Sequence, residues 1–180
     1  MKSPSEARAR RRTGPAYEGQ KYIPERRFNP FIQNLRGARI LSALQLPWYT
    51  VMPPRGTGVL TTKGAKTGQF RRKCVRVVVK GKRAYLVAIG GENVAWLKNI
   101  RVNPNVRLRI RGGAYSGVAR QVQGEAERKE ARDAFVETVM PWDYAECNFH
   151  RRGRPTREKI QELHGTWFDH GVPVIVDLQR

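Results

Sequence analysis

Apolar and basic residues alternate without a break between positions 106 and 111: Val106, Leu108 and Ile110 interleave with Arg107, Arg109 and Arg111. Successive side chains of a β-strand point to opposite faces, so this pattern predicts a strand with one core face and one strongly cationic face. Other short runs rich in Val, Leu and Ile, separated by turn residues, predict further strands. They cover residues 58–62, 74–79, 84–89 and 173–178, with one more strand ending over 120–122. Lys80-Gly81-Lys82 is expected to be the tight turn of an antiparallel hairpin.

Three segments have helical periodicity instead. Residues 93–101 place Val94 and Leu97 on one side and precede Pro104, which ends a helix. Residues 125–139 begin with acidic side chains that suit the positive end of a helix dipole, and residues 156–163 begin at Thr156, a good N-cap. A chain of 180 residues is about one domain. We therefore expect an α+β fold: an antiparallel sheet of about six strands, closed as a small barrel, with helices packed at its ends.

We expect the chain to begin with a basic flexible arm, residues 1–27. A single domain then covers residues 28–180. Three consecutive arginines at 10–12 and few apolar residues are typical of a disordered segment. From Asn29, apolar residues at helical spacing predict a helix that extends to Leu44, flanked by Arg36 and Arg39. Such a helix suits either a core or the surface of a membrane.

Positive charge is concentrated in one stretch of the chain. Residues 28–124 contain eighteen basic residues and one acid, Glu92, a net charge of +17, whereas the whole chain carries +20. Residues 1–27 carry +5 and residues 125–180 carry −2. A field of this kind indicates an anionic partner, for which nucleic acid, an anionic membrane and a polyanionic ligand all qualify.

Several classes of protein are unlikely on composition. Two cysteines, Cys74 and Cys147, form no disulfide framework, and the Arg-rich start is followed by no apolar signal segment. We therefore expect a protein of the reducing cytoplasm, with peripheral attachment to the inner face of the cell membrane as an alternative. The longest uncharged stretch is 15 residues, 40–54, which is shorter than the roughly 20 of a spanning helix. The cysteines and histidines have no zinc spacing, so we expect no metal site.

A loop rich in Gly, Thr and Lys lies between positions 60 and 71, with the sequence LTTKGAKTGQFR. It is no Walker A loop, because Leu60 and Ala65 stand where that motif requires glycines. Its backbone amides, two hydroxyls, Lys66 and Arg71 can still bind an anion. A second constellation follows: Gly90-Gly91 ends a strand, where a flat ligand can approach the backbone, and Trp96, Asn99 and Pro104 come after it.

These motifs, in this order, resemble the deazaflavin (F420)-dependent nitroreductase and quinone reductase family of actinobacteria. That family has LTTxGRKTGxxR, then a strand ending in GG, then WxxNLxxNPxV, and the resemblance extends over residues 57–122 and the closing strand at 171–176. The chain departs from the pattern at Ala65, Cys74 and Ile89, where the family has Arg, Pro and a polar residue or Lys.

The resemblance implies a split β-barrel of the FMN-binding type with peripheral helices, and coenzyme F420 as cofactor, with FMN as the alternative. F420 carries a phosphodiester and a polyglutamate tail, which accords with the cationic stretch. The implied cofactor-binding residues are Thr62, Lys66, Thr67, Gly68, Arg71, Arg72, Lys73, Cys74, Val75, Ala88, Ile89, Gly90, Gly91, Trp96 and Asn99.

The function implied is an oxidoreductase that passes hydride from reduced F420 to a lipophilic acceptor such as a quinone, nitro compound, enone or unsaturated acyl chain. Tyr144 is the one candidate for a catalytic side chain, as a proton donor. A nucleic-acid-binding module that uses the cationic barrel face is the alternative, disfavoured by the scattered aromatic residues. An anionic membrane surface and a second copy of the chain are further candidate partners.

Overall fold

A computed structural model describes residues 40, 44 and 46–179 of the chain. The expected basic arm and the start of the predicted helix lie outside the described residues. Residues 40 and 44 are helical, as predicted, and residues 46–51, beyond the predicted end at Leu44, are helical as well.

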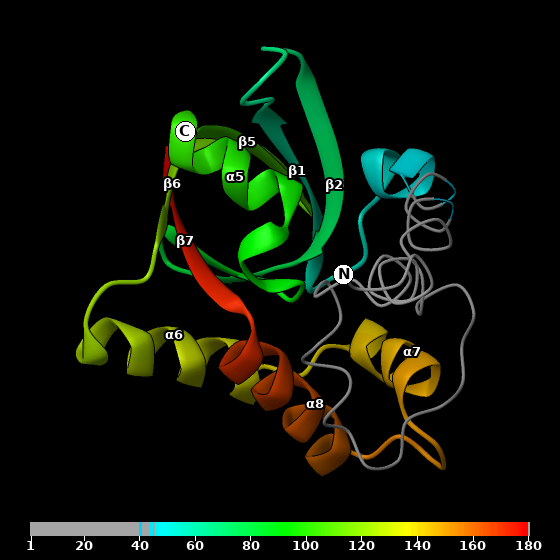
Figure 1. Cartoon of the computed structure of the whole chain (residues 1–180). Helices are drawn as coiled ribbons and strands as arrows, with labels where there is room; N and C mark the ends of the chain where they lie inside the picture. Colours follow the sequence, from blue (N-terminus) through cyan, green and yellow to red (C-terminus); the bar gives the residue numbers. More distant parts are fainter. Residues whose placement is uncertain (1–39, 41–43, 45, 180) are drawn as a thin grey trace, which may run out of the picture.

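Seven strands form one antiparallel sheet in the order β2-β1-β5-β6-β7-β4-β3 (Figure 1). Residues of β2 and β4, near opposite edges of the sheet, contact each other, so the sheet curls into an open barrel. The predicted antiparallel barrel with peripheral helices is confirmed. The strands are β1 Thr57–Lys63, β2 Phe70–Arg76, β3 Val78–Lys80, β4 Arg83–Ala88, β5 Asn105–Ile110, β6 Gly113–Gln121 and β7 Val172–Gln179.

One strand prediction needs correction. Residues 74–79 are not one strand, because Val77 leaves the ladder and donates its amide to the Gly56 carbonyl, which separates β2 from β3. Strand β6 begins at Gly113 and ends at Gln121, within the predicted end over 120–122. Its first half lacks an apolar alternation, and Gly117 is required there because a Cβ would lie 2.7 Å from the Asp177 carbonyl oxygen. Close backbone approach, rather than side-chain pattern, defines this part of the sheet.

The helices are α5 Ala95–Val102, α6 Glu125–Glu137, α7 Pro141–His150 and α8 Arg157–His170, with a 3-10 turn, η2, at Gly91–Asn93. Helix α5 therefore starts two residues later than predicted, and α8 ends seven residues further along the chain, at His170. Thr156 is the N-cap of α8, accepting a hydrogen bond from the Lys159 amide at 3.3 Å. Helix α7 was not predicted; Pro141 occupies its first turn, where no amide donor is needed.

Two apolar clusters form on the two faces of the sheet. Helix α5 lies within the curl of the barrel, where Leu97 packs with Leu60, Leu86 and Leu108 (Figure 1). Helices α6 and α8 cover the other face of β4 and β7 with Phe135, Leu163, Trp167 and Phe168. Along β4 the side chains alternate between the two clusters, so this strand is buried on both faces.

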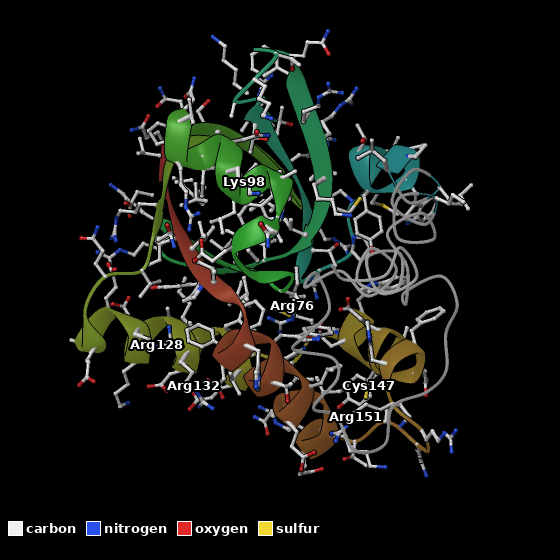
Figure 2. All side chains as sticks on the ribbon, viewed as in Figure 1. Arg76, Lys98, Arg128, Arg132, Cys147 and Arg151 are labelled. Atoms are coloured by element: carbon white, nitrogen blue, oxygen red, sulfur yellow. The ribbon has the colours of Figure 1, made fainter. Side chains whose placement is uncertain are left out.

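Arg76, the last residue of β2, is buried between the barrel and α6–α8 (Figure 2). Its guanidinium donates from Nε to Asp143 Oδ1 at 3.3 Å and from Nη2 to Asp143 Oδ2 at 3.2 Å. Nη1 donates to the Phe135 carbonyl at 3.0 Å and Nη2 to that of Thr138 at 2.6 Å, while the guanidinium carbon lies 4.4 Å from the centre of the Phe135 ring. One side chain thus joins the sheet to α6, to the residue that follows it, and to α7.

His164 of α8 completes this group, with Nδ1 3.2 Å from Arg76 Nη2. Burial and the Arg76 charge lower the pKa of His164 to about 2, so the imidazole is neutral and its 3.9 Å approach to Asp143 is no ion pair. Glu146 lies one turn after Asp143 on α7. Burial, followed by the Asp143 charge, raises the pKa of Glu146 to about 7.

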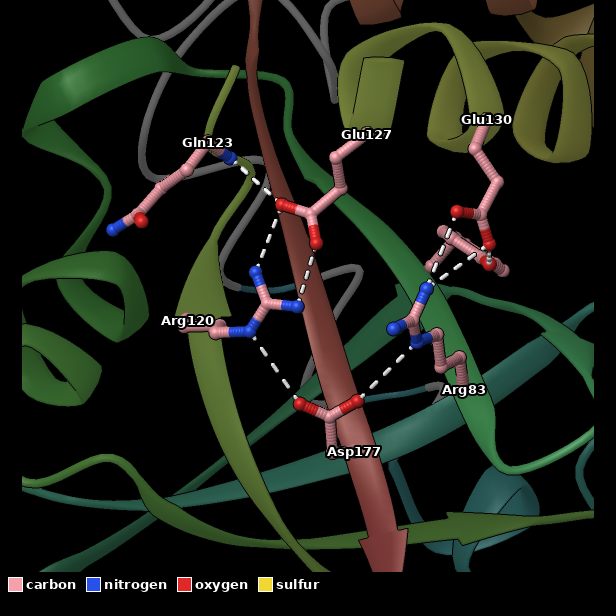
Figure 3. A network of polar contacts seen from close by, with 7 residues as sticks. Arg83, Arg120, Gln123, Glu127, Glu130 and Asp177 are labelled. Carbon is pink, nitrogen blue, oxygen red and sulfur yellow. Dashed lines mark hydrogen bonds and ion pairs between the residues drawn. The ribbon is translucent and has the colours of Figure 1, made fainter. Parts of the chain in front are cut away.

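A second polar network ties α6 to the sheet (Figure 3). Glu127 receives hydrogen bonds from Arg120 at 2.6 and 2.8 Å and from the Gln123 amide at 2.8 Å. Asp177 of β7 joins Arg120, at 3.4 Å, to Arg83, at 3.6 Å, and Arg83 also pairs with Glu130. Acids from the C-terminal part of the chain therefore neutralise arginines of the cationic stretch.

Replacing Arg76 with alanine is predicted to lower the free energy of unfolding by about 3–5 kcal/mol, because the buried Asp143 side chain would lose its partner. Urea unfolding followed by circular dichroism measures this. Arg111→Ala, at an exposed position, is the matched control and should change stability by less than about 0.5 kcal/mol. Equal losses in the two variants would contradict the assigned role of Arg76.

His164 and Glu146 are predicted to make opposite contributions to the pH dependence of stability. His164 binds a proton more readily in the unfolded chain, so its contribution falls as the pH drops below 6.5. Glu146 binds one more readily in the folded chain, so its contribution falls as the pH rises from 4.5 to about 7. The wild-type protein should show little net slope between about pH 5 and 6.5 from this pair.

His164→Asn should therefore expose the Glu146 contribution, with stability falling as the pH rises by up to about 1.4 kcal/mol per pH unit. Urea unfolding at a series of pH values between 5 and 6.5 checks the sign. His170→Asn, on the exposed end of α8, is the control. A variant at 164 with the wild-type profile would show that the buried imidazole is not neutral.

Candidate functional site

The loop between β1 and β2, residues 64–69, is closed by backbone hydrogen bonds. Lys63 pairs with Phe70 in the last register position, and the Gly64 amide donates to the Gln69 carbonyl at 2.8 Å. Gly68, with φ +68°, donates its amide to the Gly64 carbonyl at 2.8 Å. Residues 65–69 are all exposed. The loop thus presents Lys66 and Thr67 to solvent on a fixed backbone.

Asn99 of α5 holds this loop against the barrel. Its Nδ2 donates to Thr62 Oγ1 at 2.9 Å, and its Oδ1 accepts from the Ala65 amide at 3.0 Å. Both side chains are buried, Asn99 with 8% and Thr62 with 1% of its surface exposed. Two motifs more than thirty residues apart in sequence therefore meet through one carboxamide. Asn99 and Thr62 position the loop, and Lys66 and Thr67 are the side chains left to face a ligand.

Strand β4 ends at Ala88, one residue before the predicted end, and Gly90 and Gly91 lead through η2 into α5. Gly91 has φ +67°, and a Cβ built on it would meet no atom within 4 Å, so its backbone is uncrowded. The following turn is tied to α5, since Lys98 donates to Asn93 Oδ1 at 3.1 Å and Arg101 pairs with Glu92. The one acid of the cationic stretch is therefore neutralised beside the strand end.

The register of β1 and β2 divides the implied basic ligands between two faces. Residues directly opposite each other in an antiparallel pair have side chains on the same face. Arg71 pairs with Thr62 and Lys73 with Leu60, so both share the face that α5 covers, as does Val75. Arg72 and Cys74 lie on the opposite face, with Thr61 and Val59. Arg71 thus shares a face with Thr62 and α5, whereas Arg72 and Cys74 lie on the other side of the sheet.

Arg71 and Lys73 differ in environment. Arg71 is exposed and donates from Nη2 to Gln69 Oε1 at 3.1 Å, which points its guanidinium along the loop. Lys73 is partly buried, and desolvation lowers the pKa of its ammonium.

Three more of the residues implied by the resemblance lie in or against the apolar clusters. Ala88 and Trp96 belong to the cluster inside the barrel, with 1% and 8% of their surfaces exposed. Ile89 packs against the cluster under α6 and α8. Tyr144 is on the exposed side of α7, with 40% of its surface accessible.

Sequence reasoning did not single out Tyr49, which is buried against the outer face of β1 and β2. Its ring meets that of Trp142 edge to face at 6.3 Å, and desolvation raises the pKa of the phenol well above its usual value. Glu146 and Cys74 also lie close enough to influence that pKa. Tyr49 lies among apolar residues in the uncharged stretch 40–54. Nothing in that local pattern predicts its contact with β1 and β2.

These residues fit coenzyme F420. Lys66 and Arg71, with the Thr67 hydroxyl, match a phosphodiester and a carboxylate-rich tail, and charge-assisted hydrogen bonds suit both groups. The uncrowded backbone at Gly91 suits a flat ring. Among residues 40, 44 and 46–179, no group of His, Cys, Asp or Glu could hold a metal ion. Within the same residues, no helix has the length and apolar character to cross a membrane.

Comparison with known proteins identifies the family. A family model described as F420H(2)-dependent quinone reductase matches residues 48–151, which contain the loop, the Gly-Gly strand end and α5. No curated protein matches the chain.

Three solved structures illustrate the likeness. An F420-H2 dependent reductase, FDR-A, is 26% identical and has a TM-score of 0.48, covering 69% of this chain and 96% of its own. A protein described as a domain-swapped dimer is 25% identical, with a TM-score of 0.49 and coverage of 78% and 93%. A conserved hypothetical protein from Mycobacterium tuberculosis is 18% identical, with a TM-score of 0.49 and coverage of 77% and 81%.

The family match spans more than half of the chain and includes every part of the site built above. The chain therefore belongs to the F420H2-dependent quinone reductase family, and it is an F420-dependent oxidoreductase.

Proposed function

We propose that the protein transfers hydride from reduced F420 to a lipophilic acceptor, such as a quinone, nitro compound, enone or unsaturated acyl chain, at the surface of a membrane. The bonds of Asn99 to Thr62 and to the Ala65 amide are the observation that carries the cofactor part of this proposal. They fix the basic loop to α5, whose N-terminal end follows Gly91. The phosphate ligands and the place for a flat ring thus belong to one rigid unit.

The chain's own residues bind and orient in this proposal. Lys66, Thr67 and Arg71 hold the phosphate and the tail, and Gly90-Gly91 lets the ring lie against the backbone. Bound F420 supplies the hydride. A hydride transfer asks little more of a protein than correct placement and exclusion of water, so the proposal gives no acid or base of the α5 face a role in the transfer.

Replacing Lys66 or Arg71 with alanine is predicted to weaken F420 binding about tenfold or more, because each removes charge-assisted hydrogen bonds of roughly 1.5–3 kcal/mol. Titration of coenzyme fluorescence measures the affinity. Asn99→Ala should weaken binding as well, because the loop loses both of its contacts to α5. Raising the salt concentration should weaken F420 binding to the wild-type protein. The same increase should have a smaller effect on the Lys66 and Arg71 variants.

Lys80→Ala, at the exposed β3–β4 turn, is the control and should bind F420 with wild-type affinity. The same titration with FMN separates the two candidate cofactors. Tight FMN binding with no F420 binding would overturn the cofactor assignment at this site.

The membrane part of the proposal comes from the opposite face of the sheet. Arg72, Thr61 and Arg107 pair in one row across β2, β1 and β5, and both arginines are exposed. The next row is Val59 with Cys74 and Arg109, and Arg109 Nη2 donates to the Val51 carbonyl at 3.2 Å. The helical segment 46–51 therefore lies beside the exposed basic row.

That segment carries a row of exposed apolar side chains. Trp48 has 59% and Val51 75% of its surface accessible, and Phe70 on the same sheet face has 77%. Ile40, Leu44 and Met52 are also exposed. Apolar side chains beside arginines match an anionic lipid surface, since the arginines attract headgroups and the apolar groups enter the acyl boundary. A nucleic acid would use the arginines but not the apolar side chains.

Sedimentation with vesicles of mixed phosphatidylcholine and phosphatidylglycerol should recover the protein, and vesicles of phosphatidylcholine alone should recover much less. Trp48→Ser combined with Val51→Ser should reduce the bound fraction, and so should Arg72→Ala with Arg107→Ala, each basic residue contributing about 1 kcal/mol. Lys129→Ala, on the exposed side of α6, is the control. Equal recovery of all variants with the vesicles would overturn the lipid assignment. So would a protein that prefers duplex DNA to vesicles and whose serine variant binds the DNA as the wild type does.

A further inference from the structure

One row of polar side chains crosses the outer face of the sheet, the face away from α5. Arg72 of β2 stands directly opposite Thr61 of β1, and Thr61 stands directly opposite Arg107 of β5. Directly opposite residues of antiparallel strands have side chains on one face, and neighbouring strands lie about 4.8 Å apart. The two arginines therefore flank the Thr61 hydroxyl at one strand spacing on either side. We call Arg72, Thr61 and Arg107 the Thr61 row.

The guanidinium groups of the Thr61 row are free to bind a ligand. Both arginines are exposed, and within the part of the chain that the structure describes neither side chain forms a hydrogen bond or an ion pair. Arg76 and Arg120, by contrast, pair with carboxylates. The Thr61 side chain is half-buried, and the row continues on β6 with a further hydroxyl, that of Ser116. Two cations and a hydroxyl thus meet at one place on the surface.

Three donors in a row match the three terminal oxygens of a phosphomonoester. Each guanidinium presents a planar fork of N–H donors, which suits phosphate oxygens, and the central hydroxyl can donate to a third oxygen. A monoester carries close to two negative charges at pH 7 and has three acceptor oxygens. A phosphodiester carries one charge and has only two terminal oxygens, so it leaves one donor of the row without a partner. The row therefore favours the monoester.

The surroundings of the row point to a lipid headgroup as the source of this phosphate. Phe70 stands two residues before Arg72 on the same face of β2, with 77% of its surface exposed. On the other side of the row, Arg109 donates from Nη2 to the carbonyl of Val51, and 75% of the Val51 surface is exposed. Exposed apolar side chains thus lie on both sides of the cations. A free phosphate makes no use of them, whereas a lipid has acyl chains next to its phosphate.

We infer that the Thr61 row binds the phosphomonoester headgroup of a membrane lipid, and that Thr61 is the residue that distinguishes this headgroup from a phosphodiester. This rests on the proposed attachment to a membrane and not on the coenzyme, whose proposed ligands, Lys66 and Arg71, are separate residues. With the headgroup bound, each guanidinium donates to one oxygen and the Thr61 hydroxyl to the third. Phe70 and Val51 enter the acyl boundary on either side.

Co-sedimentation with two kinds of vesicle tests the inference. One kind contains phosphatidylcholine with phosphatidic acid and the other phosphatidylcholine with phosphatidylglycerol, mixed to the same electrophoretic mobility so that their surface charges match. The wild-type protein should reach half-maximal binding at about tenfold less of the phosphatidic acid vesicles, which is the effect of one additional hydrogen bond to a charged group. Equal binding of the two kinds overturns the inference.

Thr61→Val separates the hydroxyl from the charge of the surface. Valine has the shape of threonine and suits a strand, so the sheet and the net charge are unchanged. The variant should lose the preference for phosphatidic acid and bind the phosphatidylglycerol vesicles as the wild type does. Thr166→Val, at a half-buried position of α8, is the matched control and should keep the preference. A Thr61→Val variant with the wild-type preference overturns the inference.

Titration with monomeric dihexanoyl phosphatidic acid, followed by phosphorus NMR, separates this inference from membrane attachment. If the wild type binds no vesicles but binds this lipid about tenfold more tightly than Thr61→Val does, the attachment falls and the headgroup site stands. If phosphatidylglycerol vesicles bind and the preference for phosphatidic acid is missing, the attachment stands and the headgroup site falls. Glycerol 3-phosphate bound as tightly as the dihexanoyl lipid would assign the row to a free phosphate and overturn the lipid assignment.

Discussion

The burial of the Arg76 guanidinium is the constraint on which the placement of the helices depends. A desolvated cation must find partners for its N–H groups, and here they come from Asp143, the Phe135 and Thr138 carbonyls and His164. These partners lie on α6, just after it, on α7 and on α8, so three helices are fixed against the end of β2. The pair stabilises less than its geometry suggests, since desolvation offsets most of the attraction, but it selects one arrangement of the helices because losing either partner leaves a buried charge.

The same constraint explains the raised pKa of Glu146. Asp143 and Glu146 are three residues apart on α7 and so lie on neighbouring positions of one helix face. Asp143 takes two guanidinium nitrogens and the remaining one reaches a carbonyl. Glu146 is left in the same low-dielectric region with a proton instead of a cation. One turn of α7 thus carries both the ion-paired Asp143 and the neutral Glu146, because the single buried cation, Arg76, neutralises only one carboxylate.

Sequence patterns predicted the parts of the fold that depend on local periodicity. The alternation at 106–110 placed β5 correctly, and the ordered motifs identified the loop, the strand end and α5. Arg76 could not be recognised, because within a basic stretch it resembles its exposed neighbours Arg71 and Arg72, and its partners lie 59 or more residues away. The bonds of Asn99 to Thr62 and Ala65 span 37 and 34 residues and were equally invisible. Strand β6 was predicted only at its end, over 120–122, because its first half depends on backbone approach at Gly117.

The basic residues of the cationic stretch fall into two groups in the structure, those paired with carboxylates and those exposed to solvent. Arg76, Arg83, Arg101 and Arg120 pair with carboxylates, so they add little to the field outside the protein. Exposed basic groups remain on two sides: Lys66 and Arg71 by the loop under α5, and Arg72 and Arg107 on the outer face. Consecutive residues of one strand send Arg71 and Arg72 to opposite faces, and charges more than about 8 Å apart are largely screened at physiological salt. The proposed cofactor on one side and the proposed anionic membrane on the other would therefore compete little.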